Sequence, residues 1–396
     1  RRLGPRGAGA DVRPEVTAPT ASIVSPEDQS ATFVELFFDL VFVFSVTQVV
    51  GLVGHDLAWG TVAEGALVFW LVWWAWTQFT WTLNAADTEH PTVRLLTLGA
   101  TGVAFLMAVT LPDAFSDRAL WFAVPYVVVR LAGLGLQVAV ARAHDPKHHA
   151  SVRVWAALSL GGLAAVVAGA LVGGGTQHWL WGLVVVLDLT AAAVGGQAEG
   201  WFLHPEHFAE RHGLFVIIAL GETLIVAAAS LSDAAWSLEV GAVAVLAVAT
   251  SCALWWTYFP GPLPALEEGL CRADPAAEGA VARDAFSLLH FPMVLGVVAY
   301  AIGVEAALTH PTEALAPEGR LALAAGVALF VGGTGLAVWR ATGRTPGFRL
   351  VLSLGTAAGV VAVGGVAPAG SLALALAGVL AVATLESRPE ATAGSG

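Results

Sequence analysis

The chain consists largely of apolar segments about twenty residues long, the length at which an α-helix crosses the hydrocarbon core of a bilayer. Of its 396 residues, 57% are hydrophobic and 12% are charged, and the mean hydropathy is +0.74. These values are typical of integral membrane proteins, so the length sets the number of helices rather than the number of soluble domains. We predict an all-α integral membrane protein whose twelve transmembrane helices lie near 33–53, 61–83, 95–112, 119–141, 154–174, 178–196, 213–231, 236–259, 284–308, 319–339, 348–366 and 369–385.

The positions of Lys and Arg test this number, because these residues gather in the cytoplasmic loops of membrane proteins. With the N-terminus inside, fifteen of the eighteen Lys and Arg fall on the cytoplasmic side. Arg118 and Arg320 fall outside, and Arg130 lies within the fourth apolar segment. The asymmetry predicts a multi-pass protein of the bacterial inner membrane with both termini in the cytoplasm.

Composition also limits the partners. The basic residues are scattered singly and form no stripe, which excludes a nucleic-acid-binding protein. Cys252 and Cys271 provide neither a disulfide framework nor a zinc-binding pattern. We expect no cofactor and no metal, and we expect membrane lipids and a proton, small cation or small molecule as partners.

Two matched residue spacings predict two six-helix halves. Asp39 and Glu222 are separated by the same number of residues as Trp73 and Trp256, which indicates a parallel internal repeat of the kind that builds a midplane site. Coincidence in a Trp-rich sequence is the alternative. The predicted divisions are a disordered cytoplasmic tail at 1–31, a first half at 32–196, a cytoplasmic linker at 197–212, a second half at 213–385 and a cytoplasmic tail at 386–396.

Two carboxylates lie in the first apolar segment. Glu35 and Asp39 are four residues apart and therefore share one face of a helix. We expect Glu35 to be solvated at the cytoplasmic edge and Asp39 to lie deeper. An acid in hydrocarbon costs about 2.5–3.5 kcal/mol at a helix centre, so Asp39 requires a cavity, a partner or a proton. The alternative is an interhelical bond that only fixes packing.

A third acid, Glu222, follows Gly221 in the seventh apolar segment, where glycine permits close helix approach. Arg211 precedes Glu222 by three turns and lies on nearly the same helix face. Two interpretations are open: Arg211 controls the entry to a site, or it is an ordinary cytoplasmic anchor. The potential metal ligands around it lack diagnostic spacing and are expected in solvated loops: His204, His207, Glu210 and His212.

Two further positions complete the candidate polar site. His290 and Pro292 lie in the ninth segment, where proline is expected to kink the helix beside a histidine. Arg130 is a basic residue deep in hydrocarbon and a natural counter-ion for Asp39, Glu222 or Asp188. The abundant aromatic residues predict a pocket wall for an apolar or cationic ligand, formed by Phe38, Trp73, Trp74 and Trp256.

Three of these motifs resemble the bacterial low temperature requirement protein A (LtrA) family: the segment 34–43, the segment 213–222 and His290-Phe291-Pro292. The similarity runs from about Thr32 to the twelfth predicted helix. It implies a polytopic inner-membrane protein without a settled biochemical activity. By motif position, the polar residues typical of the family are Glu35, Asp39, Glu222 and His290.

We therefore weigh three functions. The first is a proton- or cation-coupled transporter or ion pathway, in which Asp39 and Glu222 bind the ion near the midplane. The second is a membrane-embedded enzyme that acts on a lipid or isoprenoid by general-acid catalysis in an aromatic pocket. The sequence lacks the Asp-rich run that a diphosphate leaving group needs. The third is a structural or regulatory protein whose acids only hold helices together.

Overall fold

The computed structural model describes residues 22–26, 29–54, 56–144, 149–195, 203–233 and 237–386. In these ranges the chain is helical apart from its connections and one isolated bridge between Val24 and Ala86. The α-helices are α1 (Phe33–Gly54), α2 (Trp59–Asn84), α3 (Pro91–Val109), α4 (Ala119–His144), α5 (His149–Val172), α6 (Gly174–Gly195), α7 (Pro205–Asp233), α8 (Leu238–Trp256), α9 (Pro262–Cys271), α10 (Glu278–Val281), α11 (His290–Thr309), α12 (Pro317–Thr342), α13 (Gly347–Ala362) and α14 (Pro368–Glu386). A short 3₁₀ turn, Leu111–Asp113, follows α3, and a π-helix, Ala282–Leu288, joins α10 to α11.

Each of the twelve predicted segments falls on a helix, and the ninth covers most of the π-helix and of α11. Ten helical segments in the described ranges are long and apolar enough to cross a membrane. The other two predicted segments are α2, which is rich in Trp, and α13, which is shorter. The chain is an all-α, multi-pass membrane protein.

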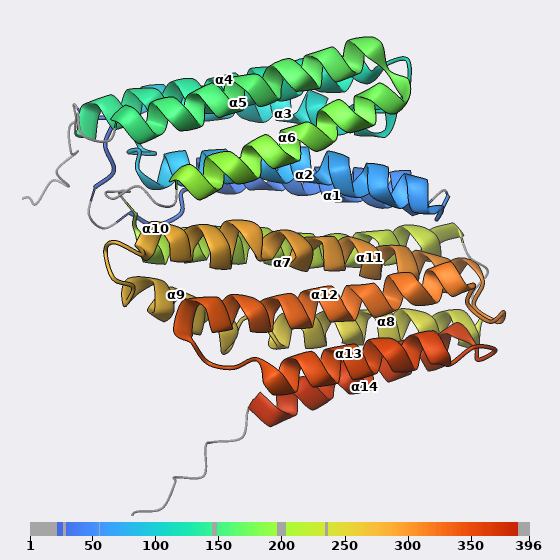
Figure 1. Ribbon diagram of the computed structural model, residues 1–396. Helices are drawn as coiled ribbons and strands as arrows, with labels where there is room; N and C mark the ends of the chain where they lie inside the picture. Colours follow the sequence, from blue (N-terminus) through green and yellow to red (C-terminus); the bar gives the residue numbers. More distant parts are fainter. Residues whose placement is uncertain are drawn as a thin grey trace, which may run out of the picture.

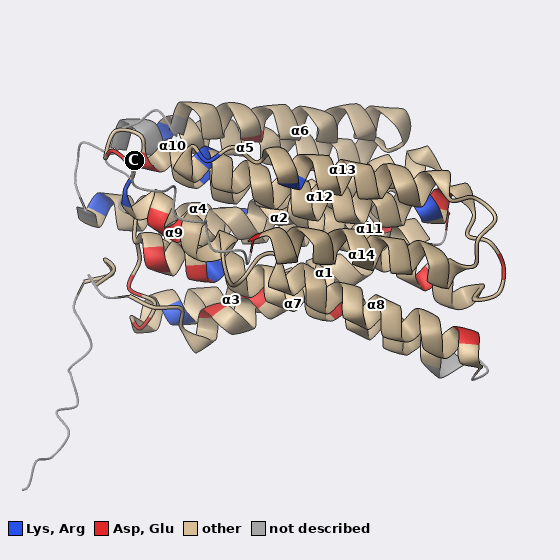
Figure 2. Ribbon diagram, turned by 90° about the horizontal axis from the view of Figure 1, so that it is seen from below, with Lys and Arg blue, Asp and Glu red and all other residues tan. Residues whose placement is uncertain are grey.

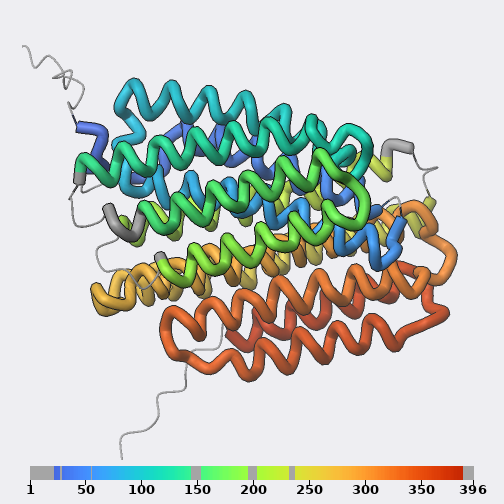
Figure 3. Tube along the Cα trace, turned by 45° about the horizontal axis from the view of Figure 1, so that its top comes forward, coloured from blue at the N-terminus to red at the C-terminus, as the bar shows by residue number. Residues whose placement is uncertain are grey.

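The helices lie side by side with nearly aligned axes (Figures 1 and 3). Helices α1 to α6 form one side of the bundle and α7 to α14 the other, and α1 packs against both α7 and α11 at the boundary. Most of the Lys and Arg visible in Figure 2 lie at the end of the bundle near the C-terminus. This is the end where α1 and α7 begin.

Small residues let α11 and α12 approach closely. A Cβ added to Gly326 would lie 2.7 Å from the Cβ of Tyr300, and one added to Gly296 would lie 2.8 Å from the backbone nitrogen of Phe330. Glycine is therefore required at both positions, as at other membrane helix interfaces. Helix α12 ends at Thr342 and is followed by Gly343, which forms a left-handed C-cap with φ of 73°.

Several boundaries differ from the prediction. Helix α7 begins at Pro205, so residues 205–212 belong to the helix rather than to a linker. The cause is the amphipathic character of its first two turns: His207, Arg211 and His212 are buried against protein, whereas Glu206 and Glu210 are exposed. A further helix, α9, lies between α8 and α10.

Pro292 does not kink a continuous α-helix. It occupies the first turn of α11, where a missing N–H leaves no hydrogen bond unmade. The irregularity precedes it in the π-helix, in which the Leu289 N–H donates to the Asp284 carbonyl oxygen at 3.1 Å. π-Bulges of this kind often accompany functional positions.

The predicted N-terminal tail is partly ordered. The Ser25 N–H donates to the Ala85 carbonyl oxygen, and the Gln29 side chain donates to the Leu83 carbonyl oxygen, so this segment lies over the end of α2. Residues 1–21, 27–28 and 387–396 lie outside the described ranges.

Candidate functional site

Two pairs of residues, each with a four-residue spacing, face one another across the contact between α1 and α7. Glu35 and Asp39 lie in the first two turns of α1, and His207 and Arg211 lie in the first two turns of α7. The two helices are parallel and in contact, so the four side chains interleave. All four are buried. We call this group the acid–base ladder.

Asp39 is held from two helices. Its Oδ1 accepts from Arg211 Nη2 at 2.5 Å and from the Trp76 indole N–H at 2.7 Å, while its Oδ2 accepts from Arg211 Nε at 3.0 Å. The Arg211 guanidinium therefore binds the carboxylate in a bidentate manner, the strongest geometry for such a pair. Asp39 is fully buried within the protein.

Glu35 is also fully buried, which corrects the expectation of a solvated edge residue. Its Oε1 accepts from Arg211 Nη1 at 2.5 Å. Its Oε2 accepts from the Thr32 backbone N–H and hydroxyl, both at 2.9 Å. The bond from the Thr32 backbone N–H is the half of a capping box that the Glu35 side chain supplies, so the burial follows from the role of Glu35 at the start of α1 as well as from its ion pair.

The tautomer of His207 follows from its neighbours. Asn84 Oδ1 accepts from the His204 backbone N–H at 2.8 Å, which fixes the orientation of the Asn84 amide. Asn84 Nδ2 therefore donates to His207 Nδ1 at 2.9 Å. His207 then carries its proton on Nε2 and donates it to Glu35 Oε1 at 3.1 Å. This arrangement requires a neutral imidazole.

The ladder is thus not neutral. Every partner of the Glu35 and Asp39 oxygens is a donor, so the hydrogen bonds favour two carboxylates. Arg211 supplies one positive charge, and no other Lys or Arg of the described chain pairs with either acid. The group carries a net charge of about −1. The N-termini of α1 and α7 offset about 0.3–2 kcal/mol each, less than the several kcal/mol that an uncompensated buried charge costs.

A second buried ion pair joins Arg130 of α4 to Asp188 of α6. Arg130 Nη2 lies 3.4 Å from Asp188 Oδ1, and Arg130 Nη1 donates to the Tyr126 hydroxyl at 3.1 Å. The Trp70 indole donates to Asp188 Oδ2 at 3.3 Å. Of the three acids suggested as partners for Arg130, the structure selects Asp188. Asp39 takes Arg211 instead.

Glu222 does not meet Asp39. Its Oε2 accepts a hydrogen bond from the Thr47 hydroxyl, and Glu222 is only partly buried. Thr47 lies two turns beyond Asp39 on α1, about 12 Å along the axis at 1.5 Å per residue. The two acids therefore lie at different depths, and they do not form a common site at the repeat interface.

His290 lies in the second half and is held by its own surroundings. Its Nδ1 donates to the Ala285 carbonyl oxygen of the π-helix at 3.0 Å, so its Nε2 accepts from the Tyr258 hydroxyl at 2.8 Å. The imidazole is connected to the ladder indirectly, through two aromatic rings. The His212 ring lies 5.1 Å from that of His290 and 5.0 Å from that of Trp76, measured between centroids, and Trp76 donates to Asp39.

The predicted aromatic wall is divided. Phe38 and Trp73 are packed in the core, where the Trp73 ring lies 4.9 Å from that of Trp76. Trp74 lines a separate small cavity. Trp256 is 55% exposed at the surface of the bundle and joins neither group.

Arg211 and His207 are the residues that sequence reasoning missed. Arg211 was interpreted as a residue at an entry or as a cytoplasmic anchor, and His207 was placed in a solvated loop. The signal that identifies them is their spacing, since a basic pair four residues apart matches the acidic pair Glu35 and Asp39 on a parallel helix. Charge pairing across helices thus contained information that hydropathy did not.

Comparisons with known proteins agree with the family resemblance. The family model described as "Bacterial low temperature requirement A protein (LtrA)" matches residues 30–384. A curated protein of Rhizobium meliloti (strain 1021), with the name "Uncharacterized protein RA0937", is 31% identical over 324 residues, which are 78% of this chain and 77% of that protein. No solved structure shows a significant match. Since the family model extends from the residues before α1 into α14, the chain belongs to the bacterial low temperature requirement A family.

Proposed function

We propose that this protein is a proton- or cation-coupled transporter or an ion pathway of the bacterial inner membrane, and that the acid–base ladder holds the ion. The observation that carries this proposal is the charge of the ladder. Two buried carboxylates share one guanidinium, and the histidine beside them is neutral. A proton or a small cation supplies the missing positive charge. Intramembrane acids that need such compensation are typical of ion pathways.

The position of the ladder suggests how ion binding is coupled to movement. Arg211 on α7 binds both Glu35 and Asp39 on α1, so it joins one half of the bundle to the other. A proton on either carboxyl group removes one of the two ion pairs and weakens that contact. The ligand thereby shifts the equilibrium between two arrangements of the halves, as alternating access requires.

The two-half arrangement and the orientation belong to the same proposal. Helix α1 packs on α2 and α3 much as α7 packs on α8 and α11, which supports parallel halves. The basic residues at the end where α1 begins support cytoplasmic termini. The ladder then lies near the cytoplasmic ends of the two halves.

The proposal is tested by proton flux in proteoliposomes that contain a trapped pH-sensitive dye, with a potassium diffusion potential imposed by valinomycin. We expect internal acidification well above that of protein-free liposomes. Asp39→Asn removes the carboxylate that the guanidinium binds, and we expect it to reduce the protein-dependent rate at least tenfold.

Asp113→Asn provides a matched control, because Asp113 is a half-exposed acid whose ion pair with Arg118 is loose at 3.6 Å. We expect this variant to retain the flux of the parent. Equal flux in Asp39→Asn and the parent, with both variants inserted in equal amounts, would rule out the proposed role of the ladder.

A further inference from the structure

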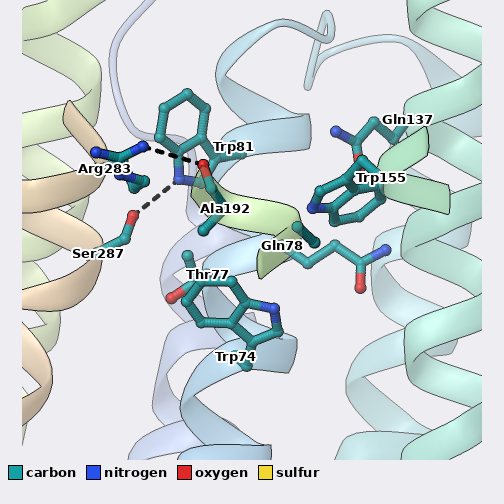
Figure 4. A pocket seen from close by; sticks show the side chains of 10 residues that line it. Trp74, Thr77, Gln78, Trp81, Gln137, Trp155, Ala192, Arg283 and Ser287 are labelled. Atoms are coloured by element: carbon teal, nitrogen blue, oxygen red, sulfur yellow. Dashed lines mark hydrogen bonds between the residues drawn. The ribbon is translucent and has the colours of Figure 1, made fainter. Parts of the chain in front are cut away.

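An apolar groove lies at the boundary between the two sides of the bundle, at the end opposite the ladder. It measures about 480 Å³, against about 50 Å³ for the cavity that Trp74 and Trp81 line between α2 and the π-helix (Figure 4). Pockets that bind small molecules usually have volumes in the range of the larger value. Val53 of α1 lines the groove and follows Asp39 of the ladder by about 21 Å along the helix, at 1.5 Å per residue.

The groove extends over the thickness of one leaflet of a bilayer. On α12 its lining runs from Pro317 to Leu329, which lie about 18 Å apart along the helix axis. The hydrocarbon core of a bilayer is about 30 Å thick, so one leaflet is about 15 Å. Glu318, beside Pro317, is the charged member of the lining, and the other lining residues are apolar. The groove therefore has the length and the chemistry that an acyl chain requires.

The groove is recessed between helices rather than being a flat surface. Helix α11 packs on both α1 and α12. Val49, Val53 and Val298 line the groove although they are only 1%, 4% and 2% exposed, so they lie at its floor. Trp59 of α2 and Leu321 of α12 are 74% and 40% exposed, so they lie at its rim. A chain that enters between the rims contacts both sides of the bundle.

A polar hollow of about 610 Å³ adjoins one end of the groove. The two share Leu57, Ala58 and Glu318 as lining residues. The hollow is also lined by Asp56 and Glu313, and all three acids are exposed. Figure 2 shows that Asp and Glu predominate over Lys and Arg at this end of the bundle, opposite the C-terminus.

The arginines at this end do not compensate the acids of the hollow. Arg118 pairs with Asp113, and Arg320 donates from its Nη1 to a backbone carbonyl oxygen of α13 at 3.0 Å. The imidazole of His310 is 3.9 Å from the Glu313 carboxylate. Within the described ranges, no Lys or Arg forms an ion pair with the three acids of the hollow. The hollow therefore complements a positively charged group.

From these observations we propose that the groove and the hollow together bind one membrane lipid whose headgroup carries a protonated amine. The acyl chain lies in the groove, and the amine lies among the carboxylates of Asp56, Glu313 and Glu318. Trp59 at the rim lies at the level of the headgroup, where aromatic residues of membrane proteins are common. A headgroup with a net negative charge meets three like charges there and is disfavoured. This lipid site is separate from the acid–base ladder and goes beyond the proposed function.

The test is native mass spectrometry of the full-length protein in detergent, with phosphatidylethanolamine or phosphatidylglycerol of identical acyl chains added in increasing amounts. The first lipid carries a protonated amine, and the second carries none and has a net negative charge. We expect one phosphatidylethanolamine molecule to be retained per chain, and phosphatidylglycerol to bind at least tenfold more weakly. This comparison requires no substitution.

A substitution in the groove tests the position of the acyl chain. Ala325 lines the groove on α12 and is half-buried, so Ala325→Phe fills part of it. We expect this variant to bind phosphatidylethanolamine at least tenfold more weakly than the parent. Ala358→Phe is the matched control, because Ala358 is exposed on α13 and does not line the groove. That variant should bind as the parent does.

A substitution in the hollow tests the position of the amine. Glu318 is an exposed acid in the first turn of α12, and we expect Glu318→Lys to remove the preference for phosphatidylethanolamine over phosphatidylglycerol. Glu239→Lys is the matched control, because Glu239 is an exposed acid in the first turn of α8, which begins at the same end of the bundle. The control should keep the preference of the parent.

The inference is overturned if the parent retains neither lipid or retains both equally. Unchanged binding in Ala325→Phe would also overturn it, as would an unchanged lipid preference in Glu318→Lys. Because the comparison of the two lipids uses the parent protein, the inference stays testable if Ala325→Phe fails to fold.

Discussion

At the scale of single residues, Arg211 is the residue that joins the two buried acids of α1 to α7. Its guanidinium makes hydrogen bonds to both Glu35 and Asp39, and none of the three side chains is exposed. When one partner of a buried pair is removed, the other charge is left without compensation. The cost then exceeds the net stabilisation that the intact pair provides.

Replacing Arg211 with Gln should therefore destabilise the protein by about 3–5 kcal/mol, because two carboxylates remain buried without their cation. Thermal unfolding of the detergent-solubilised protein measures the change. Arg94→Gln is the control, since Arg94 is a half-exposed residue paired with Glu89, and surface changes of this kind stay within about 0.5 kcal/mol. Similar unfolding temperatures for the two variants would contradict the assigned role of Arg211.

The sequence identified one side of this site and not the other. Asp39 was recognisable because an acid between Phe38 and Leu40 is costly in an apolar segment unless it has a partner. Arg130 was proposed as the counter-ion of Asp39, Glu222 or Asp188, and of these three acids it binds Asp188. A single sequence gives the depth of each charge but not which helices are neighbours, and the choice of counter-ion depends on the neighbours.

At the scale of helices, hydropathy located the elements well, because about twenty apolar residues leave little choice in a bilayer. The errors lie at polar ends. Residues 205–212 were placed in a linker, although they form two helical turns, and Pro292 was expected to kink a helix that in fact begins two residues before it. At these ends tertiary contacts rather than hydropathy decide where the helix begins.

Close packing of α11 on α12 gives a prediction at this scale. In Gly326→Ala the new methyl group meets Tyr300 atoms at 2.7–2.9 Å, two of them backbone, so the helices must separate. We expect a loss of about 1–3 kcal/mol, measured by thermal unfolding. In Gly355→Ala on α13 the methyl group meets nothing within 4 Å, and stability should stay the same or rise by up to about 1 kcal/mol. A larger loss of stability in Gly355→Ala than in Gly326→Ala would show that the close contact of α11 with α12 does not require glycine at position 326.

At the scale of the whole molecule, the contact of α1 with α7 joins the two sides of the bundle through a charged group. The repeat suggested by Asp39 and Glu222 placed these acids opposite one another. Instead, Glu222 binds Thr47, and Asp39 binds Arg211. The relative shift of two parallel helices along their axes is set by packing, and a match of residue spacings in one sequence does not determine it.

The central claim is that the ladder carries one uncompensated negative charge and takes up a proton. Infrared difference spectroscopy of the lipid-reconstituted protein, recorded between high and low pH, detects the carbonyl band of a protonated carboxyl group directly. We predict a band that is present in the parent and in Asp113→Asn and is lost or shifted in Asp39→Asn or Glu35→Gln. A spectrum unchanged by both ladder substitutions would contradict the claim.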